Sequence, residues 1–176
     1  MSRIPTHTVE NAPAVSRPLL QKIVEATPTG RLANLHAQMA HSPAVLAGYS
    51  ALRAAIADHV SLDQKIGAAL TLATAAAVGN EYMTVIAGRL AHMHGWAEGQ
   101  VAALRSGAAT GDARIDALVG LVREATANSG KVADVAWRAA QNIGWSDQQL
   151  ADAFAFLGAT MFTAYFLNYA QTDMDI

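Results

Sequence analysis

The stretch LDQKIGAALTLATAAAVGNEYM, Leu62–Met83, decides the fold class. It is rich in Ala, and small side chains at helix-forming positions favour closely packed helices over sheets. Ser61 followed by Gln64 has the pattern of a capping box, which predicts a helix that begins here and ends near Gly79. A second helix follows almost at once, over about Asn80–His94. We therefore expect two consecutive helices joined by a very short connection.

Cap and stop signals divide the rest of the chain in the same way. Ser16-Arg17-Pro18 places a cap ahead of a Pro in the first turn, where Pro costs no hydrogen bond. No segment shows sustained alternation of apolar and polar residues, so no strand is expected. The sequence predicts an all-α, single-domain helical bundle of eight or nine helices in residues 16–176, after an extended arm in residues 1–15. The other helices are expected within 28–43 and over about 43–59, 97–106, 113–128, 133–142 and from 146 past 166.

The composition excludes several kinds of partner and chemistry. The chain of 176 residues has a formal net charge of −2 and no run of Lys or Arg, so it lacks the positive surface that nucleic acids bind. It has no Cys, which excludes disulfides, thiolate catalysis and Cys-ligated metals. Residues 1–18 lack the apolar core of a signal peptide, and the low-polarity run Ile66–Gly79 is too short to span a bilayer. We expect a cytoplasmic protein without a membrane partner.

One part of the sequence echoes another. RLAHMHGWAEGQVAAL, from Arg89, is similar in residue type and phase to RAAQNIGWSDQQLADA, from Arg138. Both contain a helix end, a Gly stop, a Trp and a new capped helix, so Trp96 and Trp145 are expected to be packing anchors. Either a duplication or a common helix–turn–helix solution explains the echo.

Four pieces of the chain, in order, resemble one known family. They are MAHSPAVLAGYSAL, LDQKIGAALTLATAAAVGNEYM, HGWAEGQVAALRSG and FTAYFLNYAQTDMD, which begin at Met39, Leu62, His94 and Phe162. They resemble the alkylhydroperoxidase D-like and carboxymuconolactone decarboxylase family, in its peroxidase-like branch. The resemblance implies an all-helical fold and a homo-oligomer, whether dimer, trimer or hexamer.

The family's redox motif is a Glu on one helix, then Cys-x-x-Cys and a His on the next. Laid onto this chain, the Cys positions fall on Asn80 and Met83. The Glu position falls on Ala68 and the His position on Ala87. In the mechanism that the resemblance implies, a thiolate attacks the peroxide bond while Glu and His relay its proton. None of the four residues present can do this, so the residues exclude thiol peroxidase activity.

What remains around these positions is a candidate site for a small organic molecule. Asn80, Met83, Ala87 and His94 share one helix face at about 100° per residue, and Ala68 lies on the preceding helix. In the family this face looks into a small pocket, which Ala in place of Glu and His would make apolar and roomier. The alternative is that the two Ala residues let the helices pack closely and leave no cavity.

Three residues are candidates for acid–base catalysis, with Asn80 as an orienting amide: Tyr82, Glu81 and His41. Each also has a structural interpretation. Glu81 could be present because the helix dipole favours a carboxylate in the first turn. Tyr82 could be a packed ring of the core, and His41 could make a hydrogen bond to a nearby helix terminus. The six His residues have no spacing typical of a metal site, so we expect neither metal nor cofactor.

Two functional hypotheses follow. The first is a cofactor-independent, non-redox enzyme that uses acid–base catalysis on a small, largely apolar organic molecule, with decarboxylation or isomerisation as reaction types. The second is a catalytically silent, oligomeric binding or scaffold protein. An open pocket favours the first hypothesis and an Ala-packed site favours the second. The apolar residues Phe154, Phe162 and Tyr165 are the expected contact between subunits.

Overall fold

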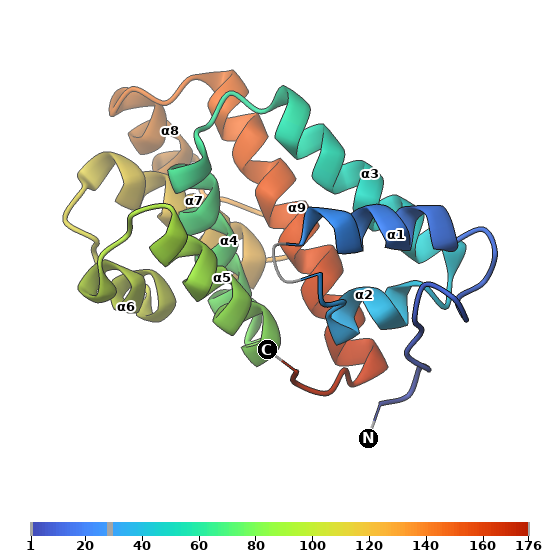
Figure 1. Ribbon diagram of the computed structural model, residues 1–176. Helices are drawn as coiled ribbons and strands as arrows, with labels where there is room; N and C mark the ends of the chain where they lie inside the picture. Colours follow the sequence, from blue (N-terminus) through green and yellow to red (C-terminus); the bar gives the residue numbers. More distant parts are fainter. Residues whose placement is uncertain (1, 28–29, 176) are drawn as a thin grey trace. The chain divides into compact units, whose positions relative to one another are not determined.

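The computed structural model describes residues 2–27 and 30–175, and every regular element in them is a helix (Figure 1). The all-α prediction is confirmed, and most predicted helix ends lie within a residue or two of the observed ones. The nine helices of the described residues are α1 (Arg17–Ala26), α2 (Asn34–Met39), α3 (Pro43–His59), α4 (Gln64–Val78), α5 (Glu81–Met93), α6 (Glu98–Ser106), α7 (Ala113–Ala127), α8 (Asp134–Asn142) and α9 (Asp147–Ala170).

The chain divides into two compact units by its internal contacts. The first comprises Met1–Ala55 with Tyr165–Ile176, and the second comprises Ile56–Ala164. The division falls within α3 and within α9. The expectation of one domain over residues 16–176 stays a prediction.

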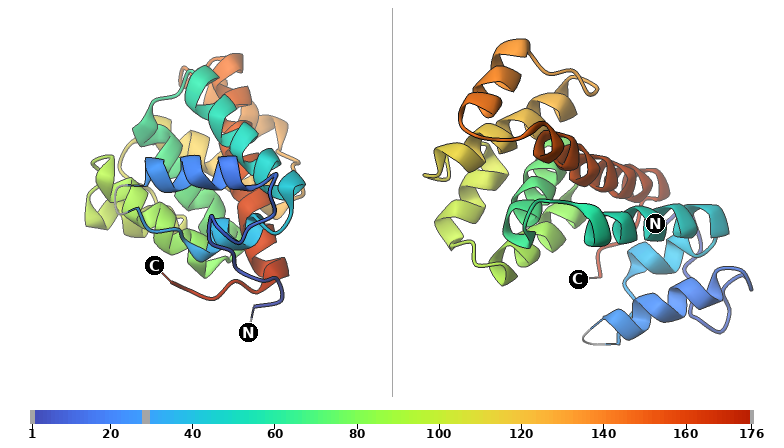
Figure 2. Two further views of the ribbon diagram at one scale, coloured as in Figure 1. Left: turned by 45° about the vertical axis from the view of Figure 1, so that its right-hand side comes forward. Right: turned by 90° about the horizontal axis from the view of Figure 1, so that it is seen from above.

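Helix α4 is the central helix of the second unit. Every residue from Gly67 to Ala75 is buried, so α4 is covered on all sides. Its neighbours within the unit are α5, α6 and α7 (Figures 1 and 2). Its Ala-rich sequence explains this position, because small side chains let several helices approach one axis closely.

The cap predicted for α4 is wrong. Asp63, not Ser61, caps the helix, and its Oδ1 accepts a hydrogen bond from Ile66 N at 2.8 Å. Ser61 instead donates from its backbone N and its Oγ to Asp152 Oδ2, at 2.7 and 2.6 Å. A carboxylate satisfies an unpaired helix N–H and also lies favourably in the helix dipole, so Asp63 is the better cap.

The two Trp residues of the sequence echo have the same environment. Trp96 Nε1 donates to Lys65 O at 2.8 Å, and Trp145 Nε1 donates to Arg114 O at 2.7 Å. In each pair the partners lie 31 residues apart. In each pair the cationic side chain of the accepting residue also lies over the indole ring. Lys65 Nζ is 4.9 Å from the ring centroid of Trp96, and Arg114 Cζ is 4.1 Å from that of Trp145. Both rings are 3% exposed, which confirms their prediction as packing anchors.

The echo extends to whole helices of the second unit. Each residue of the first Trp pair has its counterpart 49 positions later (65 to 114, 96 to 145). The same step leads from the N-cap of α4, Asp63, to the N-cap of α7, Asp112. Of the two explanations left open by the sequence, these matching contacts favour duplication.

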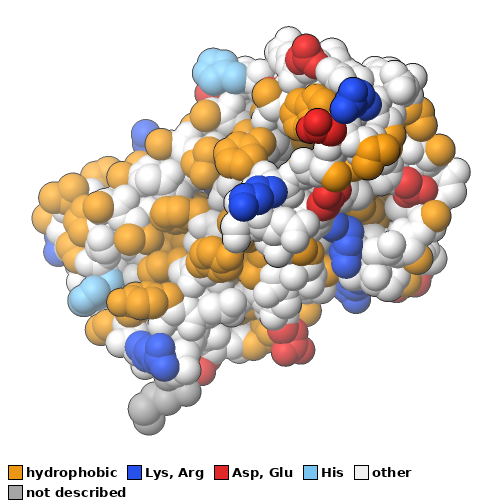
Figure 3. Space-filling view, turned by 180° about the vertical axis from the view of Figure 1, so that it is seen from behind, with side chains coloured by type: hydrophobic (Ala, Val, Ile, Leu, Met, Phe, Trp, Pro, Cys, Tyr) orange, Lys and Arg blue, Asp and Glu red, His pale blue; other side chains and the backbone are white. Residues whose placement is uncertain are grey.

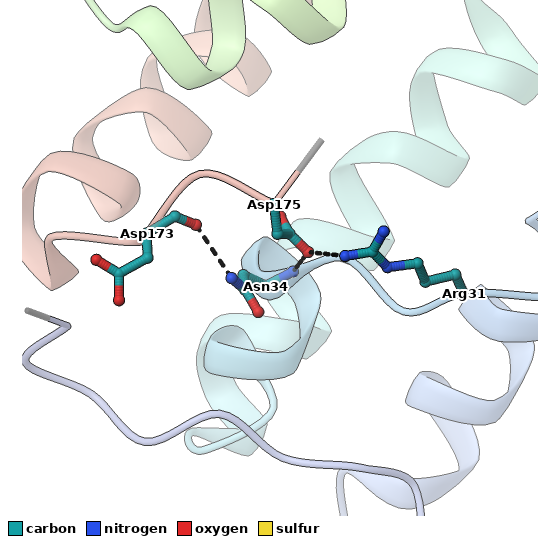
Figure 4. Close-up of polar contacts among 4 residues, drawn as sticks. All are labelled: Arg31, Asn34, Asp173 and Asp175. Carbon is teal, nitrogen blue, oxygen red and sulfur yellow. Dashed lines mark hydrogen bonds and ion pairs between the residues drawn. The ribbon is translucent and has the colours of Figure 1, made fainter.

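In the first unit, the chain after α9 is tied to the start of α2 (Figure 4). Asp175 Oδ2 accepts from Asn34 N at 3.0 Å and lies 3.8 Å from Arg31 Nη2, and Asn34 Nδ2 donates to Asp173 O at 3.1 Å. A carboxylate at a helix N-terminus is stabilised by the unpaired N–H groups there. These contacts hold α2 in place. The arm is also attached within this unit, since His7 N donates to Ala37 O at 3.0 Å.

Helix α9 has the length and composition of a membrane span, which the sequence analysis did not note. It is the one such helix in the described part of the chain, with 24 residues and a mean hydropathy of 1.5 over its most apolar window. Half of that window is buried in the protein. A core helix has the same composition, so this property gives no reason to place α9 in a bilayer.

Candidate functional site

The first candidate site is the start of α5, where Asn80 is the helix cap. Its Oδ1 accepts a hydrogen bond from Met83 N at 2.8 Å, and its Nδ2 donates to Ala164 O at 3.3 Å. The side chain is only 4% exposed. Asn is a favoured N-cap because its carbonyl satisfies a backbone N–H that the helix leaves unpaired. A substrate contact at Asn80 would therefore compete with bonds that the fold already uses.

The other residues of the predicted pocket are buried between helices. Ala68, Ala87 and Met83 are 1%, 0% and 7% exposed, and α4 packs against α5. Next to Ala68, a Cβ added to Gly67 would lie 2.5 Å from a ring carbon of Phe156. Contacts this short leave no space for another atom. The burial of Ala68, Ala87 and Met83 agrees with the close packing that is the alternative to a cavity, and the predicted pocket stays a prediction.

Two of the candidate catalytic residues, Glu81 and Tyr82, are in different environments. Glu81 is exposed in the first turn of α5, where the helix dipole favours a carboxylate. Tyr82 is buried. Neighbouring residues on a helix point about 100° apart, so the two side chains are not brought together as an acid–base pair.

The two candidate His residues lie at different places in the fold. His94 is the C-cap of α5. His41 belongs to the first unit, where its Nδ1 lies 3.0 Å from His7 Nε2 and the two rings stack at 5.3 Å between centroids. The side-chain partner of His41 is thus a residue of the arm and not a helix terminus. Within residues 2–27 and 30–175, no three His, Cys, Asp or Glu residues are placed to hold a metal ion.

A second candidate site, missed by the sequence analysis, is a pocket in the first unit between α1, α2 and α3. We call it the α1–α3 pocket. Its volume is about 590 Å³, within the range typical of small-molecule sites. Its walls carry apolar side chains of α1 and α3, and half-buried polar side chains lie between them. The apolar residues are Leu19, Ile23, Ala26, Ala47, Ala51 and Ala54, and the half-buried polar residues are Thr27, His36, Tyr49 and Ser50.

A neutral pair of rings lines this pocket. His36 Nε2 and Tyr49 Oη are 3.1 Å apart, with ring centroids at 5.3 Å. Burial, and then the charge of Arg53, lower the pKa of His36 from 6.5 to about 4, against the opposing effect of Asp175. Burial also raises the pKa of Tyr49. Both groups are therefore uncharged at neutral pH and share one hydrogen bond.

The charged residues of the pocket are all cations. Lys22 and Arg53 line it, and no Asp or Glu is among its lining residues. Neither cation has an ion-pair partner in the described residues. Ser50 Oγ, also in the lining, is buried and has no hydrogen-bond partner among these residues. The hydroxyls of Ser16 and Thr74, outside the pocket, are in the same state in the described residues.

Comparison with known proteins shows what this arrangement of helices is. No protein-family model matches the chain, and no curated protein matches its sequence. The alkylhydroperoxidase AhpD core of an uncharacterized peroxidase-related protein from Ralstonia eutropha JMP134 matches with a TM-score of 0.86. The match has 18% sequence identity and covers 99% of this chain and 92% of that one. The chain has the alkylhydroperoxidase AhpD fold.

Two further structures share the AhpD fold. An uncharacterized peroxidase-related protein from Silicibacter sp. TM1040 matches with a TM-score of 0.78 and 17% identity, over 99% of this chain and 95% of that one. The debrominase Bmp8 also matches, in the structure of a cysteine-to-alanine variant in complex with 2,3,4-tribromopyrrole. The TM-score is 0.81 and the identity 11%, over 99% of this chain and 92% of Bmp8. At these identities the comparisons establish the fold alone, and they confirm the fold predicted from the sequence.

The two positions predicted to correspond to the Cys residues of the family motif lie at one helix end. Asn80 is the cap of α5 and Met83 is its third residue, so the predicted motif lies at the start of that helix. An amide and a thioether stand there, and the chain has no Cys to replace them. The predicted positions are therefore occupied by residues that support the helix.

The α1–α3 pocket had a weak signal in the sequence. Leu19, Ile23 and Ala26 are spaced to form an apolar face of α1, and α3 carries Ala47 and Ala51 one turn apart. Small residues on an exposed helix leave room beside it. The pairing of its polar residues depends on how three helices meet, which the sequence does not reveal.

Proposed function

We propose that this protein binds a small, largely apolar organic molecule and performs no thiol-dependent redox chemistry. The observation that carries the proposal is the state of Asn80. Where the motif of the resembled family needs a thiol, the chain has a helix cap bonded to Met83 N and Ala164 O. An amide in that role has neither the nucleophile nor the redox couple of a peroxidase.

Binding is better supported than acid–base catalysis at the start of α5. Glu81 is exposed and Tyr82 is buried, and His41 has His7 as its partner. General acid–base catalysis needs groups that reach one substrate together. The positions of these three residues give little support to a decarboxylase or isomerase. The burial of Ala68 and Ala87 between packed helices gives more support to a catalytically silent site at α5.

A solved structure of this fold supports a small organic ligand. The debrominase Bmp8 was crystallised with 2,3,4-tribromopyrrole in a cysteine-to-alanine variant. A protein with this arrangement of helices therefore accommodates a small substituted ring. We propose a ligand of similar size for the present protein, which has its own pocket of about 590 Å³.

Two assays test the proposed function. With an organic hydroperoxide and a dithiol reductant, metal-free protein should give no turnover above a heat-denatured blank, because peroxide attack needs a thiolate. A thermal-shift screen of small aromatic and aliphatic acids, alcohols and ketones should find compounds that raise the unfolding temperature, because a ligand stabilises the folded state that it binds. Turnover above the blank, or a screen in which no compound stabilises the protein, would overturn the proposal.

We also propose that the protein is a cytoplasmic homo-oligomer. The expected contact residues Phe154, Phe162 and Tyr165 are 63%, 39% and 57% exposed. Hydrophobic side chains reach the surface over much of the face in Figure 3, with basic and acidic ones interspersed among them. Exposed aromatic rings favour contacts between protein surfaces. A monomer mass by light scattering at micromolar concentration would contradict the oligomer.

A further inference from the structure

We propose that the α1–α3 pocket binds an organic carboxylate with a compact apolar body, whose charged end lies between Lys22 and Arg53. The inference depends on the proposed function, since it gives that function a site and a ligand class. It concerns α1, α2 and α3, and none of the residues considered at the start of α5.

The walls of the pocket determine the body of the ligand. Leu19 and Ile23 of α1 and the small Ala47, Ala51 and Ala54 of α3 offer no hydrogen bonds from their side chains. Apolar groups placed against such walls are stabilised because they leave water. A volume of about 590 Å³ accommodates one or two fused rings or a short branched chain. The body should therefore be compact and apolar.

The two cations determine the charge of the ligand. Lys22 on α1 and Arg53 on α3 both line the pocket, and no acidic residue lines it to balance them. Arg53 affects both His36 and Tyr49 electrostatically, so its guanidinium lies near the polar end of the pocket. A guanidinium offers two parallel N–H groups that match the two oxygens of a carboxylate. Both side chains are exposed to water, so a carboxylate gains from pairing with them, and a neutral ligand makes no ion pair with either.

Polar groups beside the cations complete a carboxylate site. Tyr49 and Arg53 are one turn apart on α3, and both line the pocket together with Ser50. Ser50 Oγ is buried without a hydrogen-bond partner among the described residues, and by rotating about χ1 toward the pocket it can donate to a carboxylate oxygen. His36, neutral and bonded to Tyr49, adds no third charge, so a single negative charge suits the site better than a double one.

A pair of matched probes tests the proposal. 1-Naphthoate and 1-naphthylmethanol have the same ring and differ in charge. By isothermal titration calorimetry at neutral pH, we expect the wild-type protein to bind naphthoate at least tenfold more tightly than the alcohol. In the double variant Lys22→Gln/Arg53→Gln this preference for naphthoate should fall by roughly tenfold to a hundredfold, because that is the usual effect of losing hydrogen bonds to charged groups. The affinity for the alcohol should not change.

Two further variants serve as controls. Arg89→Gln/Lys131→Gln removes two exposed cations of the second unit and should keep the wild-type preference for naphthoate. Ala51→Phe fills the pocket and should abolish binding of both probes. Far-UV circular dichroism and unfolding temperature confirm that each variant is folded.

Several outcomes would overturn the proposal. They are equal affinity for the two probes, a preference that survives Lys22→Gln/Arg53→Gln, binding that survives Ala51→Phe, and no binding of either probe. If Ala51→Phe instead dissociates an oligomer, the pocket is a contact with a second copy of the chain and the proposal is wrong. If compounds from the thermal-shift screen still stabilise Ala51→Phe, the proposed function stands and only its site is wrong.

Discussion

The start of α5 and the α1–α3 pocket contain similar side chains in opposite states. Each combines small apolar residues with an uncharged polar group. At α5, the amide of Asn80 is bonded at both ends, and Ala68 and Ala87 are fully covered. In the pocket, Ser50 Oγ is buried without a partner in the described residues, and Ala51 and Ala54 are exposed beside open volume.

The difference separates residues that hold the fold from residues that are available for binding. A bonded cap stabilises its helix, and a ligand has to break that bond to reach it. Among the described residues, the hydroxyl of Ser50 has no hydrogen-bond partner, and Lys22 and Arg53 have no ion-pair partner. At the predicted motif position the amide of Asn80 is bonded within the fold, and the groups that we propose to bind a ligand lie in the α1–α3 pocket.

The largest expected effect comes from one substitution made in both regions. Ala87→His restores the His of the family motif at a side chain that is 0% exposed, and it should destabilise the protein by about 3 kcal/mol through overpacking and burial of a polar ring. Ala51→His places the same ring on the exposed wall of the pocket and should change the stability by less than about 0.5 kcal/mol. The free energy of unfolding, measured in urea, gives both values.

The comparison fails if Ala87→His is tolerated as well as Ala51→His. That result would mean that a cavity beside α5 accepts the ring. The start of α5 would then return as a candidate binding site, with Asn80, Met83 and Ala68 around it.

The sequence predicted the helices well because their ends depend on local residues. Pro18 in a first turn, and Gly79 in the left-handed conformation at φ 74°, act within a few residues of each helix end. Two predicted serine caps are wrong. Ser16 stands at the N-cap position of α1, but its side chain makes no cap hydrogen bond. Ser61 also had a local pattern, but the carboxylate of Asp152 bonds that serine. A distant partner of this kind is not visible in a local pattern.

The sites were harder to predict for the same reason. The absence of Cys excluded thiol chemistry without any structure. The cap bond of Asn80 with Met83 N is local, but its second bond, to Ala164 O, joins residues 84 positions apart and cannot be seen in a local pattern. The His36–Tyr49 pair joins two helices and depends on their packing. Single residues indicated what the protein cannot do, and tertiary contacts were needed to show which groups are available.

A smaller effect should appear in the pH dependence of stability. His36 has a pKa of about 4 in the folded protein and about 6.5 when unfolded. Above pH 6.5 it is neutral in both states and has no effect. As the pH falls from 6.5 to 4, the unfolded chain takes up a proton that folded His36 does not, so the free energy of unfolding should fall. The full shift corresponds to about 3.4 kcal/mol at 1.36 kcal/mol per pKa unit. Because His36 is only half-buried, solvent screening should reduce this loss to about 2 kcal/mol. Below pH 4 both states are protonated and the loss is complete.

The variant His36→Gln isolates this contribution. Urea unfolding of both proteins, measured in steps from pH 7 to pH 4, should show a shallower decline in the variant, because all other titrating groups are common to the two. Parallel curves would mean that His36 is as readily protonated in the folded protein as in the unfolded chain. The pocket would then carry a third positive charge as the pH falls below 6.5.

The smallest effects should have opposite signs in the two regions. Asn80→Ala removes the cap of α5 and leaves Met83 N and Ala164 O without that partner, so it should destabilise the protein by about 1.5 kcal/mol. Ser50→Ala removes a hydroxyl that has no partner in the described residues, so it should be neutral or stabilise the protein by up to about 1 kcal/mol. Urea unfolding without ligand measures both changes, and naphthoate binding to the folded variants should separate them further.

Asn80→Ala should keep the wild-type affinity for naphthoate, whereas Ser50→Ala should bind it several-fold more weakly, because the hydroxyl of Ser50 is proposed to bond the carboxylate. If Ser50→Ala destabilises the unliganded protein as much as Asn80→Ala does, Ser50 has a structural partner too, and the distinction between the two regions disappears.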